Sequence, residues 1–487
     1  MEPRLGASVA LIVEGSPNRV LWALRTDDAP SLEGFHVTPG GLLDALDGRL
    51  PNDGGEHVEA RVACLRELFE ETGILLAHGA DDLDEALEGE LRDALLDGDD
   101  DAVQRFEAAG LRLRTAELEP IGRWITPEFA HHRYDTRFFV MRLPDAPTPS
   151  VDIREVELAE WIDVPSALAR FARGELLVTP PLLGLLRGLE DGPLDVAAQR
   201  AAYGASAEPA QRWEVVPGIQ MLPFRTPTLP PATHTNSYLV GTGEALLVEP
   251  ATPFADERER MLRWLLEAKQ GGIEPVAMFL THHHVDHVGA ARDLYDQLGL
   301  PLWAHAETVA RLPELTFARV LDHDERVTLA GPTPMTLRFV HTPGHAPGHL
   351  CVLDEASGAL VAGDMVASIG TILVEPRDGD MTLYLRSLAA MKALRPTVLL
   401  PAHGMPIRDA DGLLDHYVAH RLAREAKVRD ALRDHGGPAQ PMDLVPVAYA
   451  DAPKLVWPLA VLSLEAHLIK LEEDGAAERT AAGWVFV

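Results

Sequence analysis

The sequence of 487 residues contains only two cysteines, Cys64 and Cys351, so it carries no disulfide framework of the kind that small secreted proteins use. Long apolar runs are also missing, and none reaches the length needed to cross a membrane. Residues 7–13 are too short and too poorly flanked by basic residues for a signal peptide. These absences predict a cytoplasmic protein with no membrane partner.

Basic residues are scarce: 43 Lys and Arg stand against 75 Asp and Glu, which gives a formal net charge of -32. A field of this sign repels polyanions, so a nucleic-acid substrate would need local basic groups or metals. Part of the acidity lies in residues 81–110, whose leucines and acids alternate in the helical pattern typical of a solvated helix face. The length predicts two or three domains rather than a single core.

Histidine, in contrast, recurs at the ends of apolar segments. Residues 281–287 read THHHVDH directly after an expected strand at residues 274–280. His345 lies in HTPGHAPGH, Asp364 in LVAGDM and His403 in VLLPAHG, each at the end of a strand-like run. Side chains at such positions project from the same edge of a sheet. Five imidazoles and two carboxylates are therefore predicted to converge.

Imidazole nitrogen and carboxylate oxygen suit zinc, and two neighbouring ions can share a hydroxide. The expected ligands are His282, His284 and His345 for one ion, Asp286, His287 and His403 for the other, and Asp364 as the bridge. Asp286 and Asp364 are also predicted to be catalytic, by fixing the ions and orienting the nucleophile. His283 is expected to point away from the ligands, and His349 to support them from behind.

Residues 213–412 resemble a metallo-β-lactamase-fold hydrolase on the strength of these ordered motifs. The likeness is closest to the beta-lactamase-like protein 2 group, through HTNSYLVG, GDMVASIGTILVEPRDGDMTLYLRSL and YVAHRLAREAKV. The resemblance implies an αββα sandwich with two Zn2+ or similar divalent ions. Glu249 replaces the aspartate usual in the superfamily, and we expect little functional effect because a carboxylate remains.

A different acidic pattern occupies the N-terminal part of the chain. A helix is expected at residues 56–72, and it contains RELFEETGI starting at Arg66. Glu67, Glu70 and Glu71 stand at i, i+3 and i+4, so three carboxylates share one helix face. Oxygen ligands grouped in this way suit Mg2+ bound to a diphosphate. The alternative is an acidic helix on which Arg66 and Glu70 form an exposed pair.

Residues 1–190 resemble a Nudix domain, whose core box reads R-E-U-x-E-E-x-G-U with U a bulky aliphatic residue. The segments RVACLRELFEETGILLA and WITPEFAHHRYDTRFFV are most similar to the branch that cleaves coenzyme A and its esters. The resemblance implies an α/β/α sandwich. Two apolar runs, residues 7–13 and 20–24, independently predict a strand hairpin ahead of the helix.

The box departs from the Nudix pattern at one position. A further glutamate normally precedes the arginine by eight residues, where this chain has Val58, and an insertion separates Gly41 from the helix. Glu56 or Glu59 takes that place only after a register shift. The domain is therefore either an active diphosphatase or a non-catalytic binding module for a nucleotide or coenzyme A.

The remaining chain consists of a linker and a tail, which completes a multidomain α/β protein. Residues 191–212 are polar and interrupted by Pro and Gly, so they are predicted to be the linker. Residues 413–487 are expected to form a long helix, two short helices and a hairpin, an order that resembles the winged-helix tail of the beta-lactamase-like protein 2 group. Because its second short helix is acidic, packing or homo-oligomerisation is favoured over DNA binding.

The ligand set favours a binuclear zinc hydrolase of ester or thioester bonds, with an acyl-coenzyme A or acyl-carrier as small-molecule substrate. The rival hypothesis is an endoribonuclease, which the beta-lactamase-like protein 2 resemblance implies and for which residues 420–433 offer basic groups. Chain acidity disfavours RNA. The segment between Asp364 and His403 is also too short for an inserted nucleic-acid-processing domain.

Overall fold

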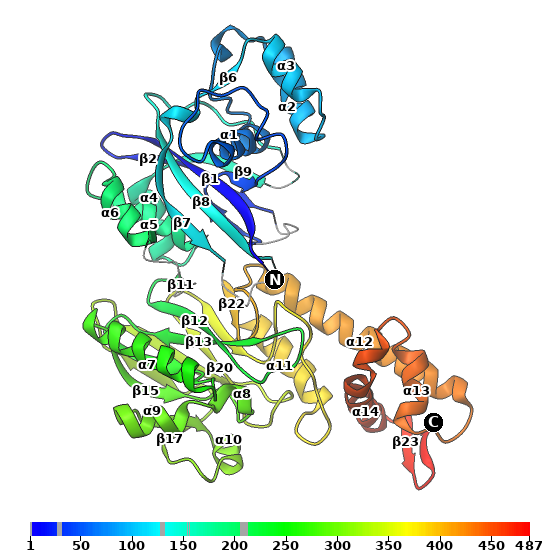
Figure 1. The fold of residues 1–487 in the computed structure, drawn as a ribbon. Helices are drawn as coiled ribbons and strands as arrows, with labels where there is room; N and C mark the ends of the chain where they lie inside the picture. The colour runs from blue at the N-terminus through cyan, green and yellow to red at the C-terminus, as the bar shows by residue number, and fades with distance from the viewer. Residues whose placement is uncertain (1, 27–31, 127–131, 153, 155, 205–212) are drawn as a thin grey trace. The chain divides into compact units, whose positions relative to one another are not determined.

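The computed structural model describes residues 2–26, 32–126, 132–152, 154, 156–204 and 213–487. Residues 127–131 of the Nudix-like segment 124–140, and residues 205–212 of the expected linker, lie outside this described part. The chain forms two compact units, Met1–Pro217 and Gly218–Val487 (Figure 1). Among the described residues, no helix combines the length and apolar character that a bilayer crossing requires.

The first unit is built around an eight-stranded sheet. Its strands run in the order β10-β3-β2-β1-β8-β7, while β4 pairs with β1 and β9 pairs with β2. The strands are β1 Arg4–Val13, β2 Arg19–Arg25, β3 Phe35–Val37, β4 Gly40–Leu42, β7 Glu119–Ile125, β8 Tyr134–Arg142, β9 Val156–Asp163 and β10 Leu177–Val178. The central strand β1 is antiparallel to β2 and parallel to β8, so the expected hairpin is confirmed.

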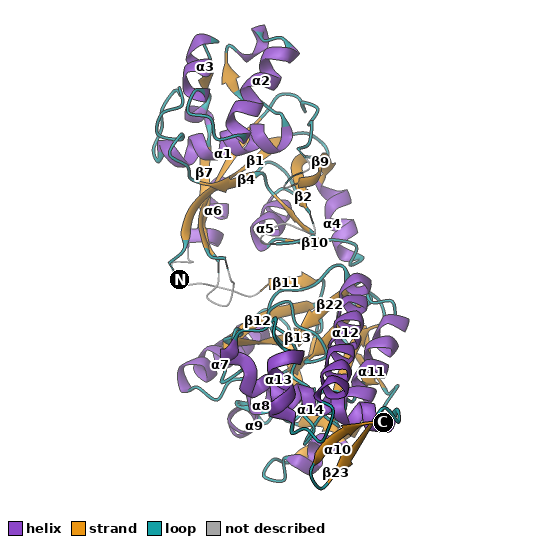
Figure 2. Ribbon diagram, turned by 90° about the vertical axis from the view of Figure 1, so that its right-hand side faces the viewer, coloured by secondary structure: helices purple, strands orange, loops and turns teal. Residues whose placement is uncertain are grey.

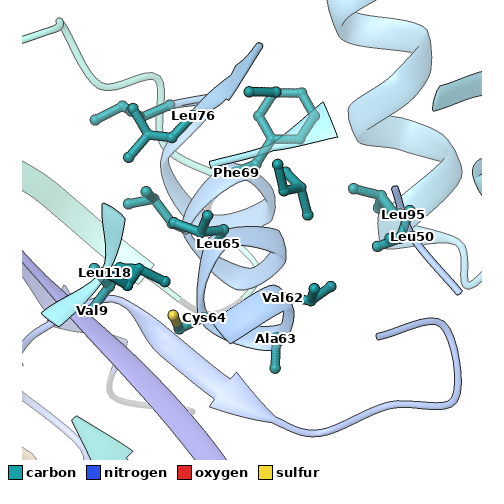
Figure 3. Packing of buried hydrophobic residues seen from close by; sticks show 14 of the residues in the cluster. Val9, Leu50, Val62, Ala63, Cys64, Leu65, Phe69, Leu76, Leu95 and Leu118 are labelled. Carbon is teal, nitrogen blue, oxygen red and sulfur yellow. The ribbon is translucent and has the colours of Figure 1, made fainter. Parts of the chain in front are cut away.

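Helices cover both faces of this sheet. They are α1 Val58–Thr72, α2 Glu85–Leu96, α3 Ala102–Ala108, α4 Val164–Ala172, α5 Pro180–Gly188 and α6 Val196–Gly204. Successive strand residues point to opposite faces of the sheet. Val9 of β1 therefore packs in the apolar core between the sheet and α1, whereas Ala10 packs in the core between the sheet and the helices α4 and α5. Figure 3 shows Val9 close to Leu118, on the side of α1 that carries Cys64. The expected α/β/α sandwich is confirmed.

The segment expected to be a linker, residues 191–212, contains the helix α6. Asp195 begins it by accepting a hydrogen bond from the N–H of Ala197. Nε of Arg200 donates to the carbonyl of Pro120 at 2.6 Å, which ties this helix to β7 of the first unit. The helix α6 is not predictable from apolar periodicity. Its alanines favour a helix but do not provide the stripe of large apolar residues that marks a buried helix face.

The second unit contains two sheets packed face to face. Within Gly218–Val487 their strand orders are β12-β13-β14-β15-β16-β17 and β18-β19-β20-β21-β22, and β11 Trp213–Val216 precedes this unit. The strands are β12 Ile219–Arg225, β13 His234–Val240, β14 Glu244–Val248, β15 Glu274–Phe279, β16 Leu302–His305, β17 Phe317–Leu321, β18 Arg326–Leu329, β19 Met335–His341, β20 Leu350–Asp354, β21 Ala359–Gly363 and β22 Val398–Pro401. The rings of Phe279 and Phe339, one from each sheet, have centroids 5.1 Å apart.

Helices lie on the outer faces of these two sheets, and one short helix lies at their edge. The helices are α7 Ala255–Gln270, α9 Ala291–Leu298, α10 Ala306–Arg311 and α11 Met381–Ala393, with α8 Val285–Val288 at the edge. Trp264 and Leu265 of α7 pack on the first sheet, whereas Tyr384 and Leu388 of α11 pack on the second. Figure 2 shows α7 and α11 on opposite sides of the strands. The expected αββα sandwich is confirmed.

The tail begins with the long helix α12, Ala410–His435, so the expected boundary after residue 412 falls inside a helix. The elements that follow are α13 Pro441–Ala448, α14 Trp457–Glu473, β23 Ala477–Thr480 and β24 Gly483–Phe486. Tyr417 of α12 belongs to the core beneath the second sheet, while Val428 and Leu432 belong to the core of the tail. The helices followed by a hairpin confirm the winged-helix expectation.

Candidate functional site

The predicted metal ligands lie at one edge of the two sheets of the second unit. The histidine-rich segment, residues 281–287, follows β15, and His345 lies in the turn between β19 and β20. Asp364 follows β21 and His403 follows β22, and these two strands are parallel. Residues that follow parallel neighbours emerge at the same edge of a sheet. The structure therefore brings all seven side chains together.

Three imidazoles form the first group. Nε2 of His282 lies 2.9 Å from Nδ1 of His284, and Nε2 of His345 lies 3.0 Å from the same atom. His282 is fully buried and His345 is almost so. Three ring nitrogens therefore meet where two of the rings are shielded from water, while the side chain of His284 is 31% exposed.

Asp286, His287 and His403 form the second group, whose ligand atoms lie within 4.8 Å of one another. Nε2 of His287 is 3.7 Å from Oδ1 of Asp286, and Nε2 of His403 is 3.7 Å from Oδ2. The carboxylate of Asp364 lies between the two groups. Its Oδ2 is 3.5 Å from Nε2 of both His287 and His345, and its Oδ1 is 3.3 Å from Nε2 of His403.

The second ring nitrogen of two of these imidazoles donates to a backbone carbonyl. Nδ1 of His345 donates to the carbonyl of Leu373 at 2.8 Å, and Nδ1 of His403 donates to that of His234 at 2.9 Å. Because a carbonyl oxygen only accepts, each bond places the ring proton on Nδ1. The lone pair of Nε2 is thereby turned towards the centre of the cluster.

His282 and His284 are held in the same way by side chains. Nε2 of His284 donates to Oδ2 of Asp378 at 2.7 Å, which leaves the lone pair of Nδ1 inward. Nδ1 of His282 lies 2.9 Å from the hydroxyl of Thr281, and that hydroxyl donates to Oε1 of Glu249. Since Thr281 gives its proton to a carboxylate, its oxygen accepts from His282. The inward nitrogen of His282 is again the unprotonated one.

Glu249, which replaces the usual aspartate, is fully buried directly after β14. Its Oε1 lies 3.2 Å from Nδ1 of His287, the outward nitrogen of that ring. Its φ of 60° is in the left-handed region, a conformation that costs a non-glycine residue on the order of 1–3 kcal/mol. The surrounding structure maintains this strained backbone, and the carboxylate consequently remains beside His287.

Burial and neighbouring charge set the protonation of the two groups. Burial lowers the pKa of His282 well below its usual value and lowers the pKa of His345 to about 4. Burial acts on His287 in the same direction, but the carboxylates of Glu249 and Asp364 outweigh it and raise the pKa of His287 well above its usual value. An ion that bound the second group would therefore displace a proton.

The chemistry of the donor set fits divalent ions. Among the described residues, Oδ1 of Asp364 and both ring nitrogens of His287 are buried without a hydrogen bond of normal geometry. Unpaired polar atoms in an interior cost free energy, which coordination of a cation offsets. Nitrogen and oxygen donors of this kind suit zinc.

Two further histidines lie next to the ligands. His349 is fully buried, its Nε2 accepts from the N–H of Asp364 at 3.1 Å, and its Nδ1 lies 2.8 Å from the hydroxyl of Thr342. It therefore contacts Asp364 through the backbone. The sequence predicts that His283 points away from the ligands, and its Nε2 lies 3.2 Å from Oδ2 of Asp378, the same oxygen that His284 contacts. Sequence reasoning did not identify Asp378, because no local pattern relates it to the histidines.

The three carboxylates predicted in the first unit lie together on α1. Nη1 of Arg66 donates to Oε1 of Glu67 and to Oε2 of Glu70, both at 2.9 Å, and Glu71 accepts from the N–H of Gly40. The Arg66–Glu70 pair is buried, unlike the exposed pair of the surface-helix alternative. Among the described residues, every group of His, Asp and Glu with ligand atoms within 4.8 Å of one another is in the second unit.

Arg66 also binds an acid that the box spacing does not predict. Its Nε donates to Oδ1 of Asp47 at 2.8 Å, and the exposed fractions of the two side chains are 6% and 1%. Asp47 precedes Arg66 by 19 residues rather than eight. Among the described residues, neither Glu56 nor Glu59 forms an ion pair with Arg66. An acid therefore still lies beside Arg66, but it comes from position 47 and not from the position that the box predicts.

Three family models match the chain. The metallo-beta-lactamase superfamily matches residues 230–403, the NUDT19 Nudix domain matches residues 44–188, and the beta-lactamase associated winged helix domain matches residues 441–484. Together these ranges include the imidazole cluster, the α1 carboxylates and the helices α13 and α14 of the tail.

Individual proteins show the same similarity. The beta-lactamase-like protein 2 homolog of Caenorhabditis elegans is 30% identical over 253 residues, which cover 50% of this chain and 80% of that protein. The atrochrysone carboxyl ACP thioesterase of Aspergillus fumigatus is 32% identical over 206 residues, 41% of this chain and 44% of that enzyme. A solved beta-lactamase domain protein from Burkholderia ambifaria has the same fold, with a TM-score of 0.51 and 24% identity over 58% of this chain and 96% of that one. The chain therefore belongs to the metallo-beta-lactamase superfamily, with a Nudix domain before the metallo-beta-lactamase fold and a winged-helix domain after it.

Proposed function

We propose that the second unit is a binuclear, zinc-dependent hydrolase of carboxylic ester or thioester bonds. The observation that carries the proposal is the orientation of the imidazoles, whose inward nitrogens surround Asp364 while acceptors face their outward nitrogens. The proposed ligands are His282, His284 and His345 for one ion and Asp286, His287 and His403 for the other, with Asp364 between them.

Divalent ions bound there supply a hydroxide at neutral pH and polarise a carbonyl group. The protein's contribution is to hold the donors in place. Acceptors behind the imidazoles oppose ring rotation, so the donors need little reorganisation. Asp364 brings negative charge between the two groups, which offsets repulsion between two cations, and Asp286 adds negative charge to the second group.

A thioester of coenzyme A or of an acyl carrier is the substrate class that we propose. The similarity to an acyl-carrier thioesterase supports this choice, although the chain spans less than half of that enzyme. The net charge of -32 opposes the approach of RNA. Between Asp364 and His403 the defined elements are α11 and β22 alone, so no nucleic-acid-processing domain is inserted there.

Thiol release from acyl-coenzyme A substrates tests this proposal, with single-stranded RNA as the competing substrate. The wild-type protein is expected to release thiol, Asp286→Ala to lose this activity, and Glu70→Gln, in the other unit, to keep it. Cleavage of RNA that disappears in Asp286→Ala, with no thiol release from any acyl chain tried, would reject the thioesterase and favour the endoribonuclease.

The buried ion pair between Asp47 and Arg66 favours a second candidate function, Mg2+-dependent hydrolysis of a phosphate anhydride by the first unit. Anchored by Asp47, the guanidinium of Arg66 holds Glu67 and Glu70 side by side. Grouped carboxylates suit Mg2+. Coenzyme A is the substrate to try, and its cleavage should require Mg2+ and disappear in Glu70→Gln. Calorimetric binding of coenzyme A without cleavage would indicate the non-catalytic binding module instead.

A further inference from the structure

Asp378 lies in the segment between β21 and α11, and backbone contacts fix this segment in place. The N–H of Asp380 donates to the carbonyl of Gly344 at 2.8 Å, in the loop that carries His345. Gly379 approaches the same carbonyl so closely that a Cβ at this position would lie 2.7 Å from it. The carboxylate of Asp378 is therefore held beside the imidazole cluster by the close packing of two loops.

Three side chains surround this carboxylate. Oδ2 accepts from Nε2 of His284 at 2.7 Å and lies 3.2 Å from Nε2 of His283. Oδ1 lies 3.5 Å from Nε of Arg311, the last residue of α10. The side chain of Asp378 is only 15% exposed, so water competes weakly for these contacts. Arg311 and His283 hold the carboxylate in the position from which it contacts His284.

His284 is the imidazole that packing holds least firmly. Its side chain is 31% exposed, whereas those of His287, His345 and His403 are at most 8% exposed. The terminal torsion of an imidazole is broad, so packing this loose leaves the ring orientation open. A half-turn about that torsion would replace the inward Nδ1 with a carbon atom. The hydrogen bond to Asp378 selects the orientation that turns a nitrogen inward.

We propose that Asp378 is a positioning residue that sets the ring orientation and tautomer of His284. The inference rests on the proposed metal centre. With the proton of His284 held on Nε2, its Nδ1 lone pair faces Nε2 of His282 and Nε2 of His345, at 2.9 and 3.0 Å. Asp378 is not itself a ligand of this group, because it bonds the opposite nitrogen of the ring and its other oxygen faces the cation of Arg311.

Zinc affinity of the full-length protein tests this role without reference to any substrate. Asp378→Ala is expected to weaken zinc binding by about tenfold to a hundredfold, measured by competition with a chromophoric chelator. Cobalt(II) bound to this variant should show an altered visible absorption spectrum, because one imidazole is no longer fixed. Asp378→Asn retains an acceptor oxygen and should recover most of the lost affinity.

Asp380→Ala is the matched control. Asp380 lies in the same segment but caps α11 by accepting from the N–H of Leu383 at 2.7 Å, so its loss should lower Tm and leave zinc affinity unchanged. Arg311→Met should reduce affinity less than Asp378→Ala does, and it preserves the backbone contacts of the segment if Asp378→Ala fails to fold.

Three outcomes separate the explanations. If Asp378→Ala binds zinc with wild-type affinity, the positioning role is overturned and the metal centre stays intact. If Asp378→Ala does not fold, wild-type affinity in Arg311→Met has the same meaning. An equal loss in Asp380→Ala would also overturn it, since the segment's fold would then be responsible. A wild-type protein that binds no zinc would overturn the proposed centre itself.

Discussion

The two units gather polar side chains in opposite ways. In the second unit, imidazoles turn one ring nitrogen towards Asp364, and acceptors behind them hold the rings in place. In the first unit, the guanidinium of Arg66 lies among Asp47, Glu67 and Glu70 and supplies a cation from the protein itself. The groups behind the ligand atoms therefore differ between the two sites: carbonyls and a carboxylate orient the imidazoles of the second unit, whereas a guanidinium orients the carboxylates of the first.

The largest expected effect comes from removing the carboxylate between the two groups. Asp364→Ala should lose at least one ion and more than about a hundredfold of the hydrolytic activity, because even changes behind metal ligands cost about tenfold to a hundredfold. Elemental analysis of the purified protein measures zinc per chain. Glu70→Gln is the matched change in the other unit and should leave the zinc content unaltered. Two ions and a wild-type rate in Asp364→Ala would refute its bridging role.

Removal of the anchoring acid in the first unit should instead affect stability. Asp47→Ala leaves the buried Arg66 without one partner, which should lower the free energy of unfolding of this unit by about 3 kcal/mol, the lower end for a broken buried pair because Glu67 and Glu70 remain. Chemical denaturation monitors the loss. Asp100→Ala, which breaks an exposed pair with Arg49, is the control and should cost about 1 kcal/mol or less. Equal effects of the two variants would contradict the anchoring role.

Acidification should empty the two metal groups in sequence. Asp364 outweighs burial and raises the pKa of His403, and the pKa of His287 is raised as well, so protons compete with an ion for the second group at higher pH. Burial lowers the pKa of His345 to about 4, so the first group should retain its ion to lower pH. Zinc per chain, measured after equilibration at successively lower pH, should fall from two to one before the remaining ion is lost. Simultaneous loss of both ions would contradict this difference between the groups.

A smaller effect is expected from the histidine behind Asp364. His349→Leu removes the acceptor of the N–H of Asp364, and zinc affinity should fall by about tenfold while two ions still bind at saturation. Chelator competition gives the affinity. His341→Leu is a suitable control, because His341 is the last residue of β19, just before the same turn, and bonds the carbonyl of Pro347 rather than a proposed ligand. A larger loss in the control would show that the turn, and not His349, supports the centre.

The convergence of the seven proposed ligands is predictable from the sequence because each follows a strand. Strand ends are visible as the limits of apolar runs, and parallel neighbours such as β21 and β22 place Asp364 and His403 at one edge. Asp378 is not predictable in this way. It is separated from His284 by 94 residues, and the contact depends on the packing of its segment against Gly344.

The first unit shows the limit of motifs that assume a fixed spacing. Lengthening a loop costs little free energy, so an insertion can separate two residues in sequence while they stay in contact. Asp47 and Arg66 are such a pair, and for this reason neither Glu56 nor Glu59 is needed to place an acid beside the arginine. The fold class is predictable from apolar periodicity. The partner of a buried charge is not, because it depends on the path that the loop takes back to the helix.

The helix α12 limits where the gene for this protein can be truncated or fused to another. The hydroxyl of Tyr417 accepts from the N–H of Ala367, and the guanidinium of Arg421 donates to the carbonyl of Ile372, in the stretch that follows Asp364. A gene truncated at the end of β22 would encode a hydrolase without these supports. A gene fusion that kept these contacts would have to carry α12 with the hydrolase at least as far as Arg421.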